Sequence, residues 1–465
     1  EGAAPSDALT LLEHAIDCRS RNGAPADRAL ADLCVKQATV LQTMSRVADA
    51  HAAASRAAGL AEKCAAPEIE GMARAQMGLA SFYLHTFPRA RTEALRAIEL
   101  GEGIGSPELL AAGGCALGWV EAVSGELDTA RQTLGRAAST ARAAALPAYG
   151  IIATAVEAQI DHWQGNCTRS LRRLRNETLP LMATSRRGEA SAFLFPQLLA
   201  LFSLGLPLAG KGAFGEAYDT FAEGLALAER VGDEIFRMRF LNSLGHVLAE
   251  CGDPEAARPL NEQSRDLALS RSDTEVLANA ELNLADGWLA RGDAALASEI
   301  AEAVLGVVKS PTTSDFMRWR YTQHLFACLG EASLAKGRLA RADDFANQCL
   351  DLATRTQSLK YLARGWRLKA GVLRGRGDVE ATGDALRHAL VQARRARNPG
   401  QIWRSELALG AVMREAGQHN AASRRFAAAN RCIATIEREL AQPELRRAFA
   451  TSKLFENAFG AAGAR

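Results

Sequence analysis

The sequence repeats itself with a period close to 40 residues. In each copy a turn residue, usually Gly, is followed five positions later by a small residue, usually Ala. The clear copies are Gly125 to Ala130, Gly212 to Ala217, Gly252 to Ala257, Gly292 to Ala297, Gly337 to Ala342 and Gly417 to Ala422, and weaker copies begin at Thr43, His85, Gly165 and Gly377. Successive copies are spaced by 42, 40, 40, 47, 40, 40, 45, 40 and 40 residues. Such a period is typical of stacked repeats, each of which buries its apolar face only against its neighbours.

One repeat shows the local pattern well. Leu241, Leu244 and Leu248 recur at helical spacing and stop before Gly252, a residue that suits the end of a helix. Asp253 can then cap the N-terminus of a second helix, with Pro at the first helical position. Asp follows the turn Gly again at Asp293 and Asp378. Each repeat is therefore predicted to be a pair of antiparallel helices.

Gly also recurs inside the first helix, seven residues before the turn. The positions are Gly118, Gly205, Gly245, Gly330 and Gly410. Gly inside a helix costs about 1 kcal/mol relative to Ala. A position that keeps taking Gly therefore implies that a neighbouring helix passes close to the backbone.

These positions together resemble the pattern of the tetratricopeptide repeat (TPR) family. In that pattern Leu-Gly precedes the turn Gly by seven residues, and an Ala, often followed by an aromatic residue, lies five residues after the turn. The best matches are Leu204 and Gly205 with Gly212, Ala217 and Phe221, and Leu409 and Gly410 with Gly417, Ala422 and Phe426. The resemblance covers nearly the whole chain, but the period is longer than the 34 residues typical of the family. This long variety is similar to the sensor regions of large bacterial signalling ATPases, cyclases and transcription activators.

The predicted fold is all-α. It is a right-handed α-solenoid, or superhelix, of antiparallel helix pairs, with about ten TPR-like repeats plus terminal helices. We expect an N-terminal half repeat and linker in residues 1–29, N-terminal repeats in 30–190, C-terminal repeats in 191–439, and a capping helix with a tail in 440–465. The two longest spacings place inserted loops near residues 178–192 and 306–315. Because the chain opens without Met, we also expect it to be part of a longer protein.

Composition indicates a cytoplasmic protein. The nine Cys are scattered and form no C-x-x-C pair, which is unlike a disulfide framework and typical of a reducing compartment. Residues 190–210 carry no charge, but they contain Pro196 and Pro207 and stay in register with the repeats. A buried helix is expected there rather than a membrane span, and no membrane partner is expected.

Charge is unevenly spread along the chain. From Ala353 onward there are 21 Lys and Arg against 9 Asp and Glu, a balance of +12, whereas the first 352 residues hold 34 against 44, a balance of −10. Such asymmetry can mark an acidic or nucleic-acid partner. The other interpretation is an ordinary set of solvated helix faces.

Local motifs of catalysis are missing from the sequence. The eight His form no H-E-x-x-H pattern and no cluster with Cys, and no G-x-S-x-G is present. The sequence therefore predicts a protein that is not an enzyme, with no cofactor and no metal site.

The resemblance to TPR proteins implies a candidate binding surface. In that family the first helix of each repeat lines a concave groove, and the groove positions lie six and three residues before the interior Gly position and one after it. The matching polar residues here are Arg239, Asn242, His246, Asn279, Asp286, His324, Glu331, Arg364 and Arg367. If these side chains face a ligand, Arg239→Ala or Arg364→Ala is expected to weaken ligand binding and barely affect the fold.

The corresponding positions toward the N-terminus are apolar. They include Leu79, Phe82, Trp119, Leu199 and Phe202, with Trp163 nearby. They form either the apolar end of a groove or part of the ordinary core. The sequence leaves both interpretations open, because it does not set the pitch of the superhelix.

The predicted function is protein–protein interaction and ligand sensing, as a scaffold that forms the regulatory repeat arm of a larger bacterial signalling protein. A peptide or protein segment is the expected partner in the concave groove, and a small effector is a second candidate ligand. The alternative is binding of nucleic acid or another acidic partner through the basic C-terminal third. Nucleic acid is not the expected partner, and the sequence does not indicate an oligomeric state.

Overall fold

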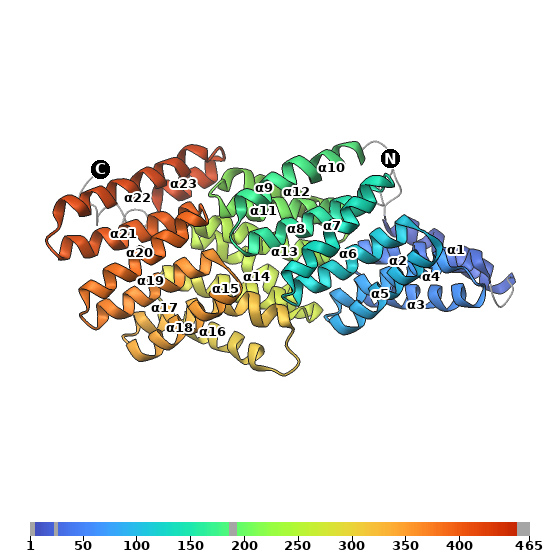
Figure 1. The fold of residues 1–465 in the computed structure, drawn as a ribbon, viewed down its shortest axis with the longest axis horizontal. Helices are drawn as coiled ribbons and strands as arrows, with labels where there is room; N and C mark the ends of the chain where they lie inside the picture. Colours follow the sequence, from blue (N-terminus) through green and yellow to red (C-terminus); the bar gives the residue numbers. More distant parts are fainter. Residues whose placement is uncertain (1–4, 23–26, 186–192, 453–465) are drawn as a thin grey trace. The chain divides into compact units, whose positions relative to one another are not determined.

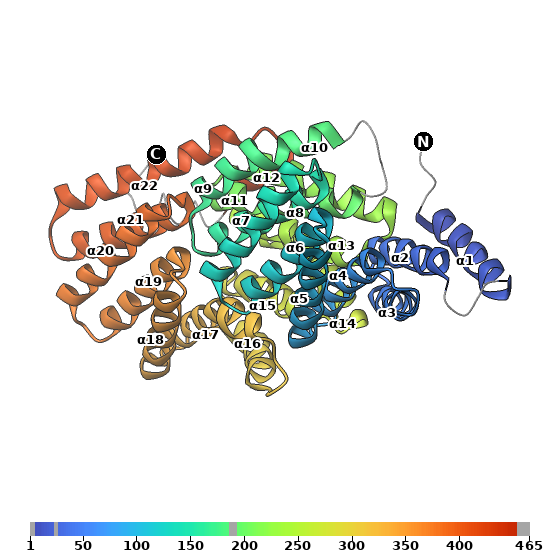
Figure 2. The same cartoon turned by 45° about the vertical axis from the view of Figure 1, so that its right-hand side comes forward.

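Antiparallel helix pairs build the fold. The computed structural model describes residues 5–22, 27–185 and 193–452, and helices are the only regular secondary structure in these ranges. The first helices of the pairs are α2 (Arg28–Thr43), α4 (Pro67–Tyr83), α6 (Pro107–Val123), α8 (Pro147–Trp163), α11 (Leu194–Gly210), α13 (Glu234–Glu250), α15 (Thr274–Ala290), α17 (Thr322–Ala335), α19 (Leu359–Gly375) and α21 (Pro399–Glu415). Successive helices pack against one another from α1 to α7 and from α14 to α22, as Figures 1 and 2 show for α17 to α22.

The second helices complete ten pairs within these ranges. They are α3 (Val47–Lys63), α5 (Phe87–Ile104), α7 (Leu127–Ala143), α9 (Cys167–Arg173) continued by α10 (Leu179–Ser185), α12 (Phe214–Val231), α14 (Pro254–Arg271), α16 (Ala294–Lys309), α18 (Leu339–Arg355), α20 (Val379–Arg395) and α22 (His419–Glu439). One helix, α1 (Pro5–Asn22), precedes the pairs, and another, α23 (Pro443–Thr451), follows them. The all-α solenoid predicted from the repeats is confirmed.

Turn residues with positive φ recur every 20 residues, except across the two long repeats, from Gly165 to Gly212 and from Gly292 to Gly337. The turn glycines predicted from the repeat take this conformation, for example Gly252 with φ 88° and Gly417 with φ 74°. Gly adopts positive φ at no steric cost, which explains its recurrence. The copy assigned to Thr43 is wrong by two residues: Thr43 ends α2, and Ser45 has φ 55°. The first spacing is therefore 40 residues and not 42.

The interior glycines lie where a neighbouring helix comes close, as predicted. A Cβ atom built on Gly205 would meet Cε1 of Phe221 at 2.3 Å, and one built on Gly410 would meet Cε1 of Phe426 at 2.7 Å. Both aromatic rings belong to the second helix of the same pair. The Leu-Gly and Ala-x-x-x-Phe positions of the repeat are thus two sides of one contact.

The Asp residues after the turns also act as predicted. Asp253 Oδ1 accepts a hydrogen bond from the Ala256 amide at 2.9 Å, and Asp293 caps the Leu296 amide in the same way at 3.0 Å. Such N-caps satisfy amide groups that have no partner inside the helix.

Each of the two long repeats contains a π-helical turn. The turn η1 (Leu174–Thr178) joins α9 to α10, and η2 (Met317–Tyr321) leads directly into α17. Both follow from extra residues in the repeat, since a π-turn accommodates one more residue than an α-turn. The first of the two inserted loops predicted from the spacing, near residues 178–192, includes residues 186–192, which lie outside the described ranges.

The chain divides into two compact units. Unit 1 comprises residues 1–160, 172–203 and 224–237, and unit 2 comprises residues 161–171, 204–223 and 238–465. The boundary that the sequence suggested between residues 190 and 191 remains a prediction.

Within each unit the stack winds back onto itself. In unit 1 Ser45 Oγ donates a hydrogen bond to Asp233 Oδ1 at 2.7 Å, across 188 residues of sequence. In unit 2 Ser358 Oγ donates to the Trp163 carbonyl oxygen at 3.3 Å, across 195 residues. The repeat pattern does not predict these contacts, because the small rotation between successive repeats determines which distant repeats come into contact.

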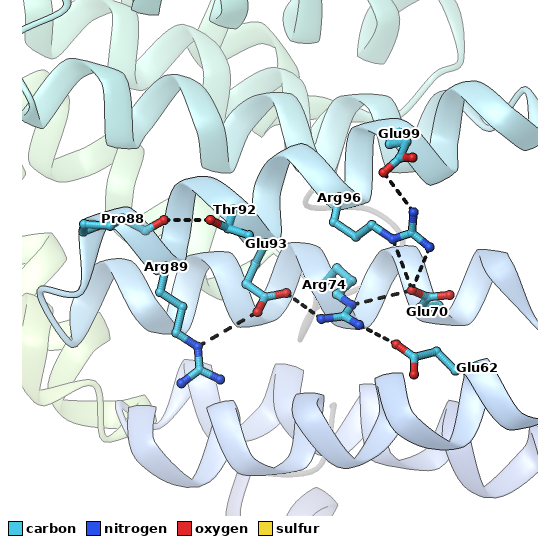
Figure 3. A network of polar contacts seen from close by, with 9 residues as sticks. All are labelled: Glu62, Glu70, Arg74, Pro88, Arg89, Thr92, Glu93, Arg96 and Glu99. Carbon is cyan, nitrogen blue, oxygen red and sulfur yellow. Dashed lines mark hydrogen bonds and ion pairs between the residues drawn. The ribbon is translucent and has the colours of Figure 1, made fainter.

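An ion-pair network ties three helices of unit 1 together (Figure 3). Arg74 on α4 reaches Glu62 on α3 and donates from Nη1 to Glu93 Oε2 on α5 at 3.0 Å. Arg96 on α5 lies 3.4 Å from Glu70 of α4 and pairs with Glu99 at 2.9 Å. Each cation of the network already has a carboxylate partner, so we assign it to packing rather than to ligand binding.

Apolar side chains are buried in and just before α23, the last described helix. Leu440 and Leu445 are fully buried, and Phe449 on α23 is 3% exposed. The capping helix expected in residues 440–465 remains a prediction, and residues 453–465 lie outside the described ranges. Within the described ranges, no helix is both long enough and apolar enough to span a bilayer, and this includes α11 in the uncharged segment.

The interior glycines provide a test of the packing. Gly205→Ala should lower the free energy of unfolding by about 1–3 kcal/mol, because the new methyl group overlaps the buried ring of Phe221. The matched control is Gly306→Ala in α16, where no atom lies within 4 Å of a built Cβ and Ala should stabilise the helix by up to about 1 kcal/mol. Urea unfolding of both variants measures the difference. A Gly205→Ala protein as stable as the parent would contradict the close helix contact.

Candidate functional site

A polar cavity of about 110 Å³ lies within unit 2. First helices of several repeats and three of the turns contribute to its wall. Its polar lining residues are His162, Asn242, Ser243, His246, Asn279, Asn283, Arg320, His324, Ser358, Lys360, Tyr361 and Asn398. The return of residues 358–361 onto residues 163–165 encloses this space, since Leu359 Cβ lies 2.9 Å from a Cβ built on Gly165.

Four of the nine predicted groove residues line this cavity. They are Asn242, His246, Asn279 and His324. Asp286, Glu331 and Arg364 form an ion-pair cluster that reaches the cavity through His324. The other two are Arg239, which lies 3.9 Å from Asp273, and Arg367, which donates to Ser405 Oγ at 3.4 Å.

The ion-pair cluster joins three consecutive repeats. Arg364 on α19 donates from Nη2 to Asp286 Oδ1 on α15 at 2.6 Å, and from Nε to Glu331 Oε1 on α17 at 2.8 Å. His324 Nε2 lies 2.7 Å from Asp286 Oδ2. The Arg364 side chain is 11% exposed, whereas Asp286 and Glu331 are about one-third exposed. The expectation that Arg364→Ala would barely affect the fold is therefore wrong, because the guanidinium neutralises two carboxylates.

The charges of this cluster shift each other's pKa values. Burial acts to raise the pKa of Asp286, but Arg364 and His324 outweigh it and hold that pKa well below its usual range. Burial acts to lower the pKa of Arg364, and the two carboxylates raise it well above its ordinary value. Asp286 and Arg364 are thus both charged at neutral pH, whereas burial lowers the pKa of His324.

A chain of asparagine amides crosses the wall of the cavity. Asn279 Nδ2 donates to Asn242 Oδ1 at 2.5 Å, and Asn242 Nδ2 donates to Asn261 Oδ1 at 3.1 Å. Asn283 Nδ2 donates to Asn261 Oδ1 at 3.3 Å. Within the described part of the chain, the side-chain oxygens of Asn279 and Asn283 accept no hydrogen bond, so both remain available to a donor in the cavity.

Three imidazoles line the cavity in their neutral form. Burial and the positive charge of Lys360 lower the pKa of His246 to about 4, against the opposing effect of Glu250. Burial and the charges of Arg320 and Lys360 hold the pKa of His162 well below its ordinary value. Because a lowered His pKa means that the unfolded chain binds protons more readily, these groups cost stability as the pH falls below about 6.5.

Two cations of the cavity were missed at the sequence level. Arg320 lies four residues before His324, and Lys360 lies four residues before Arg364, so both occupy the same position in consecutive repeats, one helical turn earlier. An alignment of the repeats could have identified both residues, because the groove face extends along the whole first helix. His162, Asn283 and Asn398 carry no comparable signature, since they lie near turns or between the groove positions.

The apolar residues toward the N-terminus are mostly core. Phe82 and Trp119 are 8% and 7% exposed, and their ring centroids lie 4.8 Å apart in an aromatic cluster of unit 1. Leu199 is 1% exposed. Leu79 and Trp119 do line a separate, largely apolar cavity of about 670 Å³ inside unit 1. Trp163 instead lines the polar cavity of unit 2.

Many arginines of the basic C-terminal third have carboxylate partners. Arg394 and Arg425 both pair with the buried Glu406, and Arg404 pairs with Glu250 at 3.0 Å. The prediction of an acidic partner there remains untested. In the described ranges no group of three or more His, Cys, Asp or Glu side chains is placed to hold a metal ion.

Comparisons with known proteins identify the fold. No family model and no curated protein matches the sequence. Among solved structures, a Rap protein complexed with competence and sporulation factor is similar at a TM-score of 0.60 and 10% identity, over 80% of this chain and 99% of that one. NprR in complex with its cognate peptide NprX is similar at a TM-score of 0.50 and 12% identity, over 73% of this chain and 97% of that one. A Rap conjugation gene regulator of the plasmid pLS20, in complex with the Phr* peptide, also has a TM-score of 0.50, at 11% identity over 63% of this chain and 78% of that one.

The chain has the tetratricopeptide-repeat fold. Its identity to these TPR-like structures is too low to transfer a function, so the shared property is the arrangement of helix pairs. The TPR resemblance predicted from Leu-Gly, the turn Gly and Ala is confirmed at the level of fold. In this chain the longer, 20-residue half period produces helices of about 17 residues.

The ion-pair cluster of the TPR stack gives a stability prediction. Arg364→Met should lower the free energy of unfolding by about 3 kcal/mol, because Asp286 and Glu331 lose the cation that they share. The matched control is Arg374→Met, whose ion pair with Glu415 is exposed on both sides and should contribute less than about 1 kcal/mol. Urea unfolding at pH 7 compares the two variants. Equal losses would contradict a structural role for the cluster.

Proposed function

We propose that this TPR protein is a regulatory scaffold that binds a peptide, or an unstructured protein segment, in the polar cavity of unit 2. The proposal includes the sequence-based expectation that the repeats form the sensing arm of a larger bacterial signalling protein. Seven of the nine predicted groove residues fall into two roles. Asn242, Asn279, His246 and His324 contact the ligand, whereas Asp286, Glu331 and Arg364 hold consecutive repeats in position.

The available amide oxygens of Asn279 and Asn283 carry the proposal. An extended peptide presents backbone N–H groups that must find acceptors when water is excluded. Two side-chain carbonyl oxygens on adjacent turns of α15 supply such acceptors at the cavity wall. The amide chain through Asn242 and Asn261 holds at least the first of them in place, so little side-chain entropy is lost on binding.

The size of the cavity limits what can enter. A volume of about 110 Å³ is smaller than the roughly 300–1,000 Å³ of typical small-molecule sites. It suits one end or one side chain of a longer ligand better than a whole drug-sized molecule. A peptide that inserts one end and lies along the first helices satisfies this constraint.

The structural similarities support the same class of ligand. The Rap and NprR structures are complexes with competence and sporulation factor, the Phr* peptide and NprX. At 10–12% identity this is an analogy between folds and says nothing about the peptide sequence that this chain prefers.

Selection from a library of random soluble heptapeptides tests this function. Calorimetry of a selected peptide should give saturable binding at one site. Asn279→Ala should weaken that binding about tenfold, because one acceptor is lost to the ligand and a neighbour of Asn242 is removed. The matched control is Asn420→Ala, an exposed position at the start of α22, and it should leave the affinity unchanged.

Two results would contradict the proposal. Failure to select any saturable ligand from the library would remove the peptide-binding function. Tight binding of duplex DNA or RNA, with an affinity that falls steeply with salt concentration, would favour the alternative of a basic nucleic-acid surface.

A further inference from the structure

The cavity of unit 1 has the dimensions of a small-molecule site. Its volume is about 670 Å³, within the roughly 300–1,000 Å³ that such sites usually occupy, whereas the unit 2 cavity measures about 110 Å³. Side chains from α2, α4, α6, α8 and the start of α11 line it, and all of these segments belong to unit 1. The proposed peptide-binding function makes no use of this cavity.

Apolar and aromatic side chains form most of the wall. Among them are Met72 and Leu79 on α4, Trp119 on α6 and Phe195 on α11. Cys115 also lines the cavity, and burial raises the pKa of its thiol to about 12, so this group stays uncharged at neutral pH. A wall of this kind favours a ligand with an apolar body, because binding removes apolar surface of both partners from water.

The side chain of Gln76 provides an acceptor at this wall. Gln76 Nε2 donates to Thr39 Oγ1 at 2.6 Å, and Thr39 Oγ1 donates in turn to the Val35 carbonyl oxygen at 3.2 Å. Because the hydroxyl proton of Thr39 is already used, the Gln76 amide must present its nitrogen to Thr39. Gln76 Oε1 is buried and accepts no hydrogen bond from the described residues. A buried carbonyl oxygen of this kind needs a donor.

The hydroxyl of Tyr149 provides a second acceptor. Tyr149 Oη donates to Met72 Sδ at 3.6 Å, and within the described part of the chain its oxygen accepts no hydrogen bond. Burial raises the pKa of Tyr149, and the negative charge of Glu108 raises it further. The Glu108 carboxylate therefore lies near this phenol, on the same cavity wall.

The charge of the lining is negative. Its carboxylates are Asp32, Glu68 and Glu108, and Lys36 is the one cation among its described lining residues. Asp32 pairs with Lys36 at 2.7 Å, and Glu68 pairs with Arg28 at 3.5 Å. Glu108 is exposed and has no cationic partner in the described chain. One uncompensated negative charge therefore remains beside the two acceptors.

We infer that the unit 1 cavity binds a small molecule that has an apolar body and carries a primary or secondary ammonium group. Such a group donates two or three hydrogen bonds and accepts none, which matches the oxygens of Gln76 and Tyr149, and its positive charge complements Glu108. A carboxylate ligand would instead add a second negative charge beside Glu108 and leave Gln76 Oε1 without a donor. The inference goes beyond the proposed function, because it concerns a second ligand of different chemistry in the other unit.

A series of fluorescent probes tests this inference on the full chain. Dansylcadaverine joins an apolar dansyl ring system to a primary amine, its N-acetyl derivative is neutral, and N-dansyl-6-aminohexanoate ends in a carboxylate. Dansyl emission increases when the ring enters an apolar site, so titration of each probe with protein at pH 7 gives its affinity. Dansylcadaverine should bind saturably and about tenfold more tightly than either of the other probes, because only its ammonium group forms charge-assisted hydrogen bonds with the acceptors.

Two variants assign the amine to this cavity. Gln76→Leu removes the buried acceptor, so it should weaken dansylcadaverine binding about tenfold and affect the neutral probe less. Glu108→Gln should weaken dansylcadaverine binding about threefold, since this carboxylate is exposed. The matched control is Glu444→Gln, because Glu444 is also exposed and also follows Pro at the start of a helix, but outside the cavity. It should leave the affinity unchanged.

Circular dichroism checks that each variant is folded, and Glu108→Gln carries the test if Gln76→Leu unfolds. Three outcomes would overturn the inference. If no probe produces a saturable change in emission, the cavity does not bind small apolar molecules. If the neutral probe or the acid binds as tightly as dansylcadaverine, the cavity does not select an amine. If both variants bind dansylcadaverine as the parent does, the amine lies elsewhere. Peptide binding that depends on Asn279 in unit 2 would survive all three outcomes, so failure here is distinguishable from failure of the proposed function.

Discussion

The contact between residues 163–165 and residues 358–361 is the constraint on which the unit 2 cavity depends. Gly165 has no side chain, and Leu359 takes the space beside it, while Ser358 donates a hydrogen bond to the Trp163 carbonyl. A stack of helix pairs without this return would expose its first helices as an open groove. The return turns part of that groove into an enclosed cavity, and burial there is the largest cause of the lowered pKa values of His162 and His246.

Electrostatics divide the first helices of unit 2 into two parts. Around Arg364 every charge has a partner, and the ion pairs run from repeat to repeat, so this part fixes the stacking of α15, α17 and α19. One turn earlier along the repeats, Arg320 and Lys360 form no ion pair in the described chain, although the charge of Lys360 helps to lower the pKa of Glu250. The two parts therefore differ in how their charges are paired, although their residues look alike in sequence.

The sequence predicted what depends on local geometry and missed what depends on the return of the chain. Gly205, Gly212 and Phe221 keep fixed spacings, because one helix pair repeats the same packing, and the helix pairs and close contacts were therefore predictable. Ser45 was missed, because a residue other than Gly took the positive φ. Which groove residues are free depends on neighbours from other repeats: Arg364 and Lys360 are equally polar in sequence, but only Arg364 meets carboxylates. The pitch that brings residue 358 to residue 163 follows from small rotations that no motif encodes.

The pKa of His246 tests the central claim most directly, because it reports whether the wound stack encloses this residue. Protein labelled with ¹³C-histidine is titrated by NMR, and the signal is assigned by its loss in His246→Gln. Burial and the charge of Lys360 predict a pKa of about 4, so the ring should stay neutral down to about pH 5. A pKa near the ordinary value of about 6.5 would show a solvated, open groove and would contradict the enclosed cavity.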